Sequence, residues 1–242
     1  MPGSSGAKWA GWPPPGRRPR RRPGPRTTAY LTDLLPAEAD LRPQRYITSR
    51  TPRAHLPYRK TLDTFDLAFQ PRVDERQIRE LATLPWGDAA AHLVVLGPPG
   101  VGKTHLVVAL ALAAIQARHS VYFITVQDLV ADRRKAWQEN RFTPRLAVYT
   151  RPTLLCIDEV GYLALDRVEA NRLFRVVSAR YETGSLALPA NKGFSERGDV
   201  CGDPVLATAI LDRLVKTSYH VVLQGKSYRP RRRGSPRPTG RR

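Results

Sequence analysis

The segment "VVLGPPGVGKTHLVVALALAA", residues 94–114, constrains the fold more than any other part of this 242-residue chain. It places a glycine-rich loop between an apolar run of β type and an apolar run of helical type. Residues 97–104 match the pattern G-x-x-x-x-G-K-[ST] at every fixed position. The glycines of such a loop let successive backbone N–H groups face phosphate oxygens at the positive end of the next helix. The segment therefore predicts a strand, a phosphate-binding loop and a helix in succession.

Apolar runs of two kinds alternate through the middle of the chain. Runs typical of strands occupy residues 93–96, 121–124, 153–157, 185–188 and 219–223. Runs typical of helices occupy residues 103–118, 126–139, 166–182 and 204–216, and a further helix at 73–84 leads into them. Strands that alternate with helices need crossover connections, because parallel neighbours cannot be joined by tight turns. The expected fold is α/β, with a parallel sheet covered by helices on both faces.

The two ends of the chain differ in composition from its middle. Residues 1–26 are mostly Pro, Gly and Arg, and the chain becomes basic again after Gln224. Such segments bury too little apolar surface to offset the entropy of ordering, so we expect disordered basic termini. Residues 27–60 are mixed and weakly periodic, and they allow one short helix without a clear core face. We expect a largely disordered Pro/Arg-rich segment at 1–60, one domain at 61–228 and a basic tail at 229–242.

The formal net charge of +19 favours a polyanionic partner, and nucleic acid comes before an anionic membrane surface. No apolar run approaches the roughly 20 residues of a membrane span. The arginine-rich start lacks the apolar segment of a signal peptide. We therefore expect a cytoplasmic protein without a membrane partner. Cys156 and Cys201 lack the spacing of metal ligands, so neither is expected to carry chemistry.

Two carboxylates follow the apolar run at residues 153–157, in "TLLCIDE". Parallel strands end at one edge of a sheet, so Asp158 and Glu159 are expected beside the glycine-rich loop. Such a site suits a nucleoside triphosphate with Mg²⁺. Lys103 would reach the β- and γ-phosphates, Thr104 and Asp158 would hold Mg²⁺, and Glu159 would act as general base on the attacking water. The expected nucleotide-binding residues are Gly97, Pro98, Pro99, Gly100, Val101, Gly102, Lys103, Thr104 and His105.

The expected nucleotide is ATP. Guanine-binding proteins commonly carry N-K-x-D, whereas residues 191–194 read "NKGF" and place Phe at the base-reading carboxylate. The L-S-G-G-Q signature of transporter ATPases is absent from the sequence. The remaining classes are strand-inserted or oligomeric ATPases that act on nucleic acid or protein.

Four segments carry a resemblance to a known family: "LGPPGVGKTHL", "LLCIDEVGYLALD", "GDPVLATAILDRL" and "GKSYR". Together they resemble the IstB family, the ATP-binding helper proteins of insertion-sequence transposition, which are related to the DnaC helicase loaders within the AAA+ ATPases. The resemblance covers about residues 61–228. It implies a P-loop AAA+ fold. It also implies that Asn191 senses the γ-phosphate, that Arg213 is an arginine finger for an adjacent subunit, and that Arg229 is a second sensor arginine.

The chain departs from the family at two places. Family members tend to read T-S-N-K-P-F-S-E-W around the sensor, whereas residues 188–197 read "LPANKGFSER". Pro189 lacks a backbone donor and Ala190 lacks a hydroxyl, so we expect an altered strand end or sensor geometry and slow hydrolysis. The family also usually has a helical N-terminal domain, and here that domain is expected to be degraded.

The function implied by the resemblance is that of an ATP-dependent transposition helper. It would form a homo-oligomer on double-stranded DNA and recruit or stimulate the transposase of the same element, with ATP hydrolysis driving disassembly or target selection. Two alternatives stay open: a DnaC-like loader of a replicative helicase, and a non-hydrolysing remnant that binds nucleotide and DNA. The arginine runs at both ends would add contacts to DNA phosphates without reading sequence.

Overall fold

The computed structural model describes residues 44–67, 70, 73–139, 141–160, 165–191, 204–216, 218–225 and 227–228. All of them belong to one compact unit, Pro43–Arg242, and the other unit, Met1–Arg42, lies outside the described residues. The predicted disorder of residues 1–26 and 229–242 stays a prediction, because these residues lie outside the described part of the chain. Among the residues that are described, no helix is long and apolar enough to cross a membrane.

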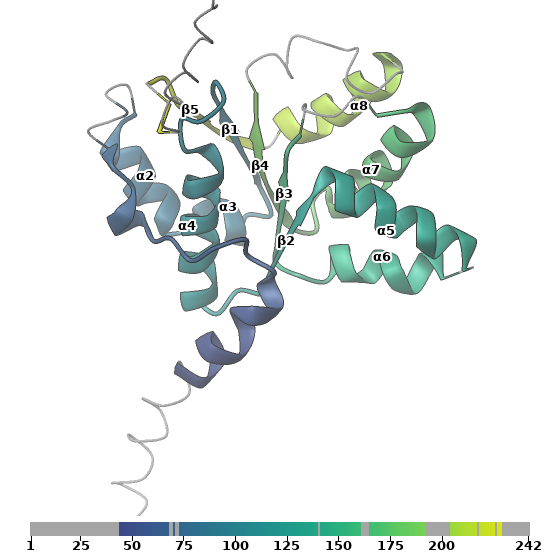
Figure 1. Ribbon diagram of the computed structural model, residues 1–242, viewed down its shortest axis with the longest axis horizontal. Coiled ribbons are helices and arrows are strands. Elements are labelled where there is room, and N and C mark those ends of the chain that lie inside the picture. Colours follow the sequence, from purple (N-terminus) through teal and green to yellow (C-terminus); the bar gives the residue numbers. More distant parts are fainter. Residues whose placement is uncertain are drawn as a thin grey trace, which may run out of the picture. The chain divides into compact units, whose positions relative to one another are not determined.

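Five parallel strands form the central sheet, in the order β2-β3-β4-β1-β5 (Figure 1). They are β1 (His92–Leu96), β2 (Val121–Thr125), β3 (Leu154–Asp158), β4 (Ser185–Ala190) and β5 (Ser218–Val222). Every predicted strand is present, with its ends shifted by at most two residues. Because all strands run in the same direction, the segments that follow β1, β3 and β4 emerge at one edge of the sheet.

Helices cover both faces of the sheet (Figure 1). One face carries α2 (Glu75–Ala82), α3 (Pro85–Asp88) and α4 (Lys103–Gln116), and the other carries α5 (Val126–Gln138), α6 (Phe142–Thr150), α7 (Arg167–Arg180) and α8 (Pro204–Val215). Each face has its own apolar core: Leu106 and Leu110 of α4 belong to one, and Leu129 and Leu173 of α5 and α7 belong to the other. The predicted α/β fold is confirmed.

Helix α6 was not predicted. Its sequence "FTPRLAVYT" has Pro144 in the first turn, a position where a missing N–H is tolerated. The residues that follow do not repeat with a helical period strong enough to mark a core face. A bidentate hydrogen bond anchors the helix instead, because Arg145 of α6 donates from Nε and Nη2 to the Asp132 carboxylate of α5.

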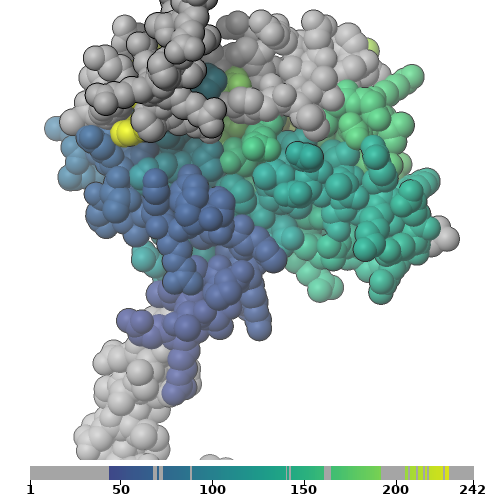
Figure 2. Space-filling model, in the orientation of Figure 1, coloured from purple at the N-terminus to yellow at the C-terminus, as the bar shows by residue number. Residues whose placement is uncertain are grey.

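Residues 44–60 pack against the sheet domain, although the sequence predicted a largely disordered segment with at most one short helix. Residues 44–50 are helical, and the 3₁₀ helices η1 (Pro52–Ala54) and η2 (Leu62–Thr64) follow. The Tyr46 hydroxyl donates to the Arg118 carbonyl over 2.8 Å, Ala54 is buried, and the His55 ring lies 5.0 Å from the Tyr122 ring. Figure 2 shows the purple and blue residues of this segment lying against the teal surface beside them. Residues 44–60 thus belong to the same compact unit as the sheet.

Strand β4 continues through Pro189, where an altered strand end was expected. Pro189 is in register with Val95 of β1, and the strand ends at Ala190. The ladder between β4 and β3 extends only as far as Ala187, so the missing N–H of Pro189 falls where pairing on that side has ended. Asn191 consequently leaves the sheet from a regular strand.

Candidate functional site

The glycine-rich loop between β1 and α4 has backbone geometry that requires glycine at specific positions. Gly100 and Gly102 adopt φ values of 81° and 97°, in the left-handed region that side chains disfavour. At Gly97, an added Cβ would lie 2.6 Å from the Leu223 carbonyl oxygen. The buried Gln70 side chain donates to the Val101 carbonyl over 2.9 Å and holds the loop from the protein side. The loop is therefore built and braced as the phosphate-binding motif predicts.

Lys103 is the buried cation of this loop. Its Nζ donates to the carbonyl oxygens of Gly97 and Pro98 over 2.9 and 2.8 Å, and to Asn191 Oδ1 over 3.1 Å. Asn191 directly follows β4, the neighbour of β1 in the sheet. The structure thus brings together two predicted site residues that are 88 positions apart in the sequence. The substitutions at Pro189 and Ala190 leave Asn191 within hydrogen-bonding distance of Lys103.

A cavity of about 340 Å³ lies beside the loop. The loop and α4 contribute Gly100, Gly102, Lys103, Thr104 and His105, β3 contributes Asp158, and segments outside the loop contribute Tyr58, Lys60, Thr64, Asp66 and Tyr228. Thr104 and Asp158, the predicted metal ligands, line the same cavity. A hydroxyl and a carboxylate are hard oxygen donors of the kind that Mg²⁺ prefers, so these residues fit that ion.

His105 contacts the segment that precedes the domain core. Its Nε2 lies 3.2 Å from Thr64 Oγ1 and 3.4 Å from the Thr61 carbonyl oxygen, and its ring meets Phe65 edge to face. Burial lowers the pKa of the imidazole, although the contact with Thr61 opposes this effect. His105 therefore ties the first turn of α4 to η2. Its predicted contact with nucleotide stays a prediction.

Glu159 sits at a sharp turn just after β3. Its φ of 63° lies in the left-handed region, and its N–H donates to Asp158 Oδ1 over 2.7 Å. The next residue, Val160, is buried and forms a bridge with Ala190, so the chain is held on both sides of the turn. A left-handed non-glycine residue costs about 1–3 kcal/mol and persists where its surroundings fix it. Glu159 is exposed and is not among the residues that line the cavity.

Arg213 lies on α8, outside the lining of its own chain's cavity. Its guanidinium carbon is 4.7 Å from the centre of the Phe174 ring of α7, and its Nη1 donates to the Ala209 carbonyl over 3.2 Å. The structure therefore does not bring Arg213 together with Lys103 in one chain. Arg229 lies outside the described residues.

Residues without a predicted role also reach the site. Tyr228 donates from its backbone N–H to the Gly100 carbonyl over 2.8 Å and from its hydroxyl to the Asp66 carbonyl over 2.6 Å. Tyr58 and Lys60 line the cavity from the other end of the described chain. Tyr228 belongs to the quoted "GKSYR" segment, which was a signal that could have found it. No sequence signal marked Tyr58 or Lys60.

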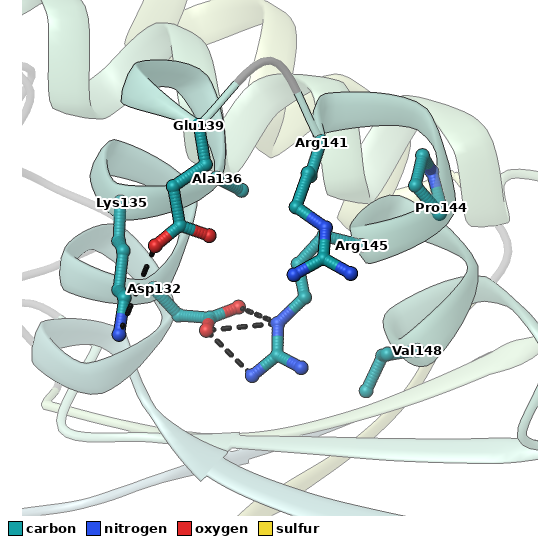
Figure 3. Close-up of a pocket in the computed structure, with 8 residues that line it drawn as sticks. All are labelled: Asp132, Lys135, Ala136, Glu139, Arg141, Pro144, Arg145 and Val148. Atoms are coloured by element: carbon teal, nitrogen blue, oxygen red, sulfur yellow. Dashed lines mark hydrogen bonds and ion pairs between the residues drawn. The ribbon is translucent and has the colours of Figure 1, made fainter.

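A second cavity, of about 370 Å³, lies between α5 and α6. It is lined by Asp132, Lys135, Ala136, Glu139, Arg141, Pro144, Arg145 and Val148 (Figure 3). The Asp132 carboxylate accepts hydrogen bonds from Arg145 and from the Tyr149 hydroxyl. Burial opposes the charge of Asp132, but these hydrogen bonds outweigh it and lower the pKa of the carboxyl. This network ties one helix to the other.

The sequence as a whole matches a known family. A sequence model of the IstB-like ATP binding proteins matches residues 26–235. The chain belongs to this family. The resemblance inferred from the four motif segments is thereby confirmed, and the match begins well before residue 61, where the resemblance was expected to start.

Individual relatives of this IstB-family protein come from insertion sequences. The chain is 48% identical over 202 residues to a protein named for ATP binding in insertion sequence IS5376 of Geobacillus stearothermophilus, covering 84% of this chain and 80% of the relative. It is 45% identical over 200 residues to a protein named for ATP binding in insertion sequence IS21 of Pseudomonas aeruginosa, covering 83% and 76%.

Solved structures share the fold. A DnaC helicase loader superposes with a TM-score of 0.55 and 20% identity, covering 71% of this chain and 97% of that one. The AMPPCP-bound DnaA of Aquifex aeolicus superposes with a TM-score of 0.57 and 18% identity, covering 70% of this chain and 51% of that one. At such identities the likeness concerns the fold alone, which is that of a P-loop AAA+ ATPase.

Proposed function

We propose that this protein binds ATP with Mg²⁺ in the cavity beside the glycine-rich loop and hydrolyses it. The observation that carries the proposal is the 3.1 Å hydrogen bond from Lys103 Nζ to Asn191 Oδ1, beside a cavity that Thr104 and Asp158 also line. The glycine-rich loop, the two expected magnesium ligands and the expected sensor residue thus lie at one edge of the sheet, which supports this proposal. Membership of the IstB-like ATP binding proteins supports ATP as the nucleotide.

Each side chain has a distinct task in this proposal. Lys103 exchanges the carbonyls of Gly97 and Pro98 for phosphate oxygens, because hydrogen bonds between charged groups are stronger than those to neutral acceptors. Thr104 and Asp158 hold Mg²⁺, which supplies charge neutralisation at the phosphates when it is bound. Asn191, released from Lys103, orients the attacking water, and Glu159 accepts a proton from it.

We further propose that the ATP-bound protein assembles on double-stranded DNA as a homo-oligomer and recruits or stimulates the transposase of its insertion sequence. The insertion-sequence names of its relatives support the biological setting, and the net charge of +19 supports a polyanionic partner. Arg213 lies away from the cavity of its own chain, which supports a role at the site of a neighbour. Hydrolysis would then require assembly.

The alternatives receive less support. Likeness to a helicase loader at 20% identity concerns the fold and does not extend to loading a helicase. A remnant that cannot hydrolyse ATP was inferred from Pro189 and Ala190, yet β4 passes regularly through both and places Asn191 against Lys103. This geometry favours a working sensor.

The proposal is tested by steady-state ATP hydrolysis with and without double-stranded DNA at several protein concentrations. We expect DNA to stimulate turnover and specific activity to rise steeply with protein concentration. Lys103→Ala serves as the inactive control. Confirmed ATP binding without turnover under any of these conditions would refute the hydrolysis proposal, and a specific activity independent of concentration would refute the requirement for assembly.

A further inference from the structure

The segment between η1 and η2 supplies two side chains to the nucleotide cavity. Tyr58 and Lys60 line the same cavity as Lys103, Thr104 and Asp158. Their segment precedes the predicted domain border and contains no recognised phosphate-binding motif. Apart from Lys103, Lys60 is the one lysine or arginine in the lining of this cavity, as far as the described residues extend.

Lys60 belongs to the lining of the cavity that the functional groups of the site share. Lys60 Nζ lies 5.3 Å from the centre of the Tyr58 ring. Its charge contributes to the lowered pKa of His105, after the larger effect of burial, so it acts on the first turn of α4. Burial and the negative charge of Asp158 raise the pKa of Tyr58. Tyr58 and Lys60 therefore line one cavity together with the first turn of α4 and Asp158, the predicted magnesium ligand.

The Lys60 ammonium makes no ion pair with a carboxylate of the described residues. Its interaction with the Tyr58 ring is a cation–π contact, which is weak at an exposed position. A charge-assisted hydrogen bond to a phosphate oxygen is stronger. An anion entering the cavity can thus draw the ammonium away from the ring.

We propose that Lys60 is a second phosphate-binding cation of this site, acting within its own chain beside Lys103. The inference rests on the proposed binding of ATP. Tyr58 holds the ammonium at the cavity while no phosphate is bound, and the phosphates of the nucleotide then take it over. Nucleotide binding would thereby pull the segment at residues 58–61 toward the loop, which links residues 44–60 to the nucleotide state.

Three variants separate charge from packing. Lys60→Met keeps the aliphatic stem and removes the charge, and Lys60→Arg keeps the charge. Lys135→Met is the matched control. Lys135 of α5 is also exposed, but it lines the second cavity, where its Nζ lies 3.9 Å from Glu139 Oε1 (Figure 3). Thermal melting of all three variants checks that the fold is retained.

The measurement is equilibrium binding of fluorescent ATP and ADP analogues, with unlabelled adenosine as a competitor that has no phosphate. We expect Lys60→Met to weaken ATP binding about tenfold, the size of one charge-assisted hydrogen bond. Binding by Lys60→Arg should stay within about twofold of wild type, allowing for its different geometry. Lys135→Met should match wild type. The loss of ATP affinity in Lys60→Met should become smaller as the salt concentration rises, because salt screens exposed charges.

Several results would overturn the inference. Unchanged ATP binding by Lys60→Met, an equal loss in Lys60→Met and Lys60→Arg, or an equal loss of adenosine binding would each show that the charge of Lys60 does not act on phosphate. In all of these cases wild-type protein still binds ATP, so the proposed function survives. Wild-type protein that binds no ATP would remove the proposed function and this inference together.

Discussion

The two cavities of the sheet domain have similar volumes and both contain charged side chains, yet those charges are satisfied differently. Between α5 and α6, Asp132 and Arg145 bind each other in a bidentate pair. Beside the glycine-rich loop, Lys103 donates hydrogen bonds to two backbone carbonyls and to the Asn191 side chain. Hydrogen bonds to neutral acceptors can be exchanged for stronger ones to a charged ligand, whereas opening an ion pair leaves a charge without its partner. This difference, and not cavity size, supports the proposal that the nucleotide binds beside the loop.

The largest expected effect tests whether the nucleotide cavity is incomplete within one chain. Arg213→Ala should retain ATP binding and lose turnover by about a thousandfold, because an arginine finger stabilises charge in the transition state. Mixing Arg213→Ala with Lys103→Ala should restore part of the activity, since each variant supplies what the other lacks at a shared interface. Single-turnover hydrolysis of the mixture measures this rescue. If the mixture is as inactive as its components, Arg213 does not act in trans.

The second-largest expected effect is a difference in turnover between two carboxylate variants, one at Glu159 near the nucleotide cavity and one at Asp132 in the cavity between α5 and α6. Glu159→Gln should lower turnover by about a hundredfold or more while leaving ATP binding close to wild type, because a general base acts on the water and not on nucleotide affinity. Asp132→Asn should leave the turnover of folded protein unchanged. Steady-state hydrolysis and equilibrium ATP binding on the same preparations separate the two. Equal loss of turnover in both variants would contradict the distinction between the cavities.

The third effect concerns the free energy of unfolding. It tests the contribution of the hydrogen bonds that join Asp132 of α5 to Arg145 and Tyr149 of α6. Asp132→Asn should lower the free energy of unfolding by about 1–3 kcal/mol, because Arg145 and Tyr149 lose a charged partner. The pKa of Asp132 is lower in the folded protein than in the unfolded chain, so its contribution is present above the unfolded pKa. That contribution disappears as the pH falls through the folded pKa. Urea unfolding at pH 7 and under acid conditions should show the deficit of the variant only at the higher pH.

The sequence predicted the features that depend on local patterns, and it missed the features that depend on contacts between distant residues. The strands, the loop and helices such as α4 and α7 follow from local patterns, because the apolar run of α4 and the capping box at the start of α7 each lie within a few positions. Lys103 and Thr104 were predicted from the phosphate-binding motif. Asp158 was predicted because it follows a buried strand, and parallel strands share one C-terminal edge. Asn191 was predicted only from the resemblance to the family.

Other features depend on long-range packing, which a single sequence does not reveal. Helix α6 is anchored by the pairing of Arg145 with Asp132 and has no strong period of its own. Lys60 reaches the cavity because residues 44–60 follow the outside of the domain, fixed by contacts such as that between Tyr46 and Arg118. The continuation of β4 through Pro189 likewise depended on where its ladder with β3 ends.

The smallest expected effect concerns the brace across the loop. Tyr228 joins the Gly100 and Asp66 carbonyls, so its hydroxyl connects the C-terminal and N-terminal sides of the cavity. Tyr228→Phe keeps the ring and the backbone bond and removes one hydrogen bond, which contributes about 0.5–1.5 kcal/mol. We expect ATP affinity to fall about threefold, corresponding to less than 1.4 kcal/mol. Tyr219→Phe, at an exposed tyrosine on the edge strand β5, is the matched control. Equal ATP affinity in Tyr228→Phe and Tyr219→Phe would mean that the brace stabilises the fold without shaping the site, since the ring and backbone contacts of Tyr228 would then suffice.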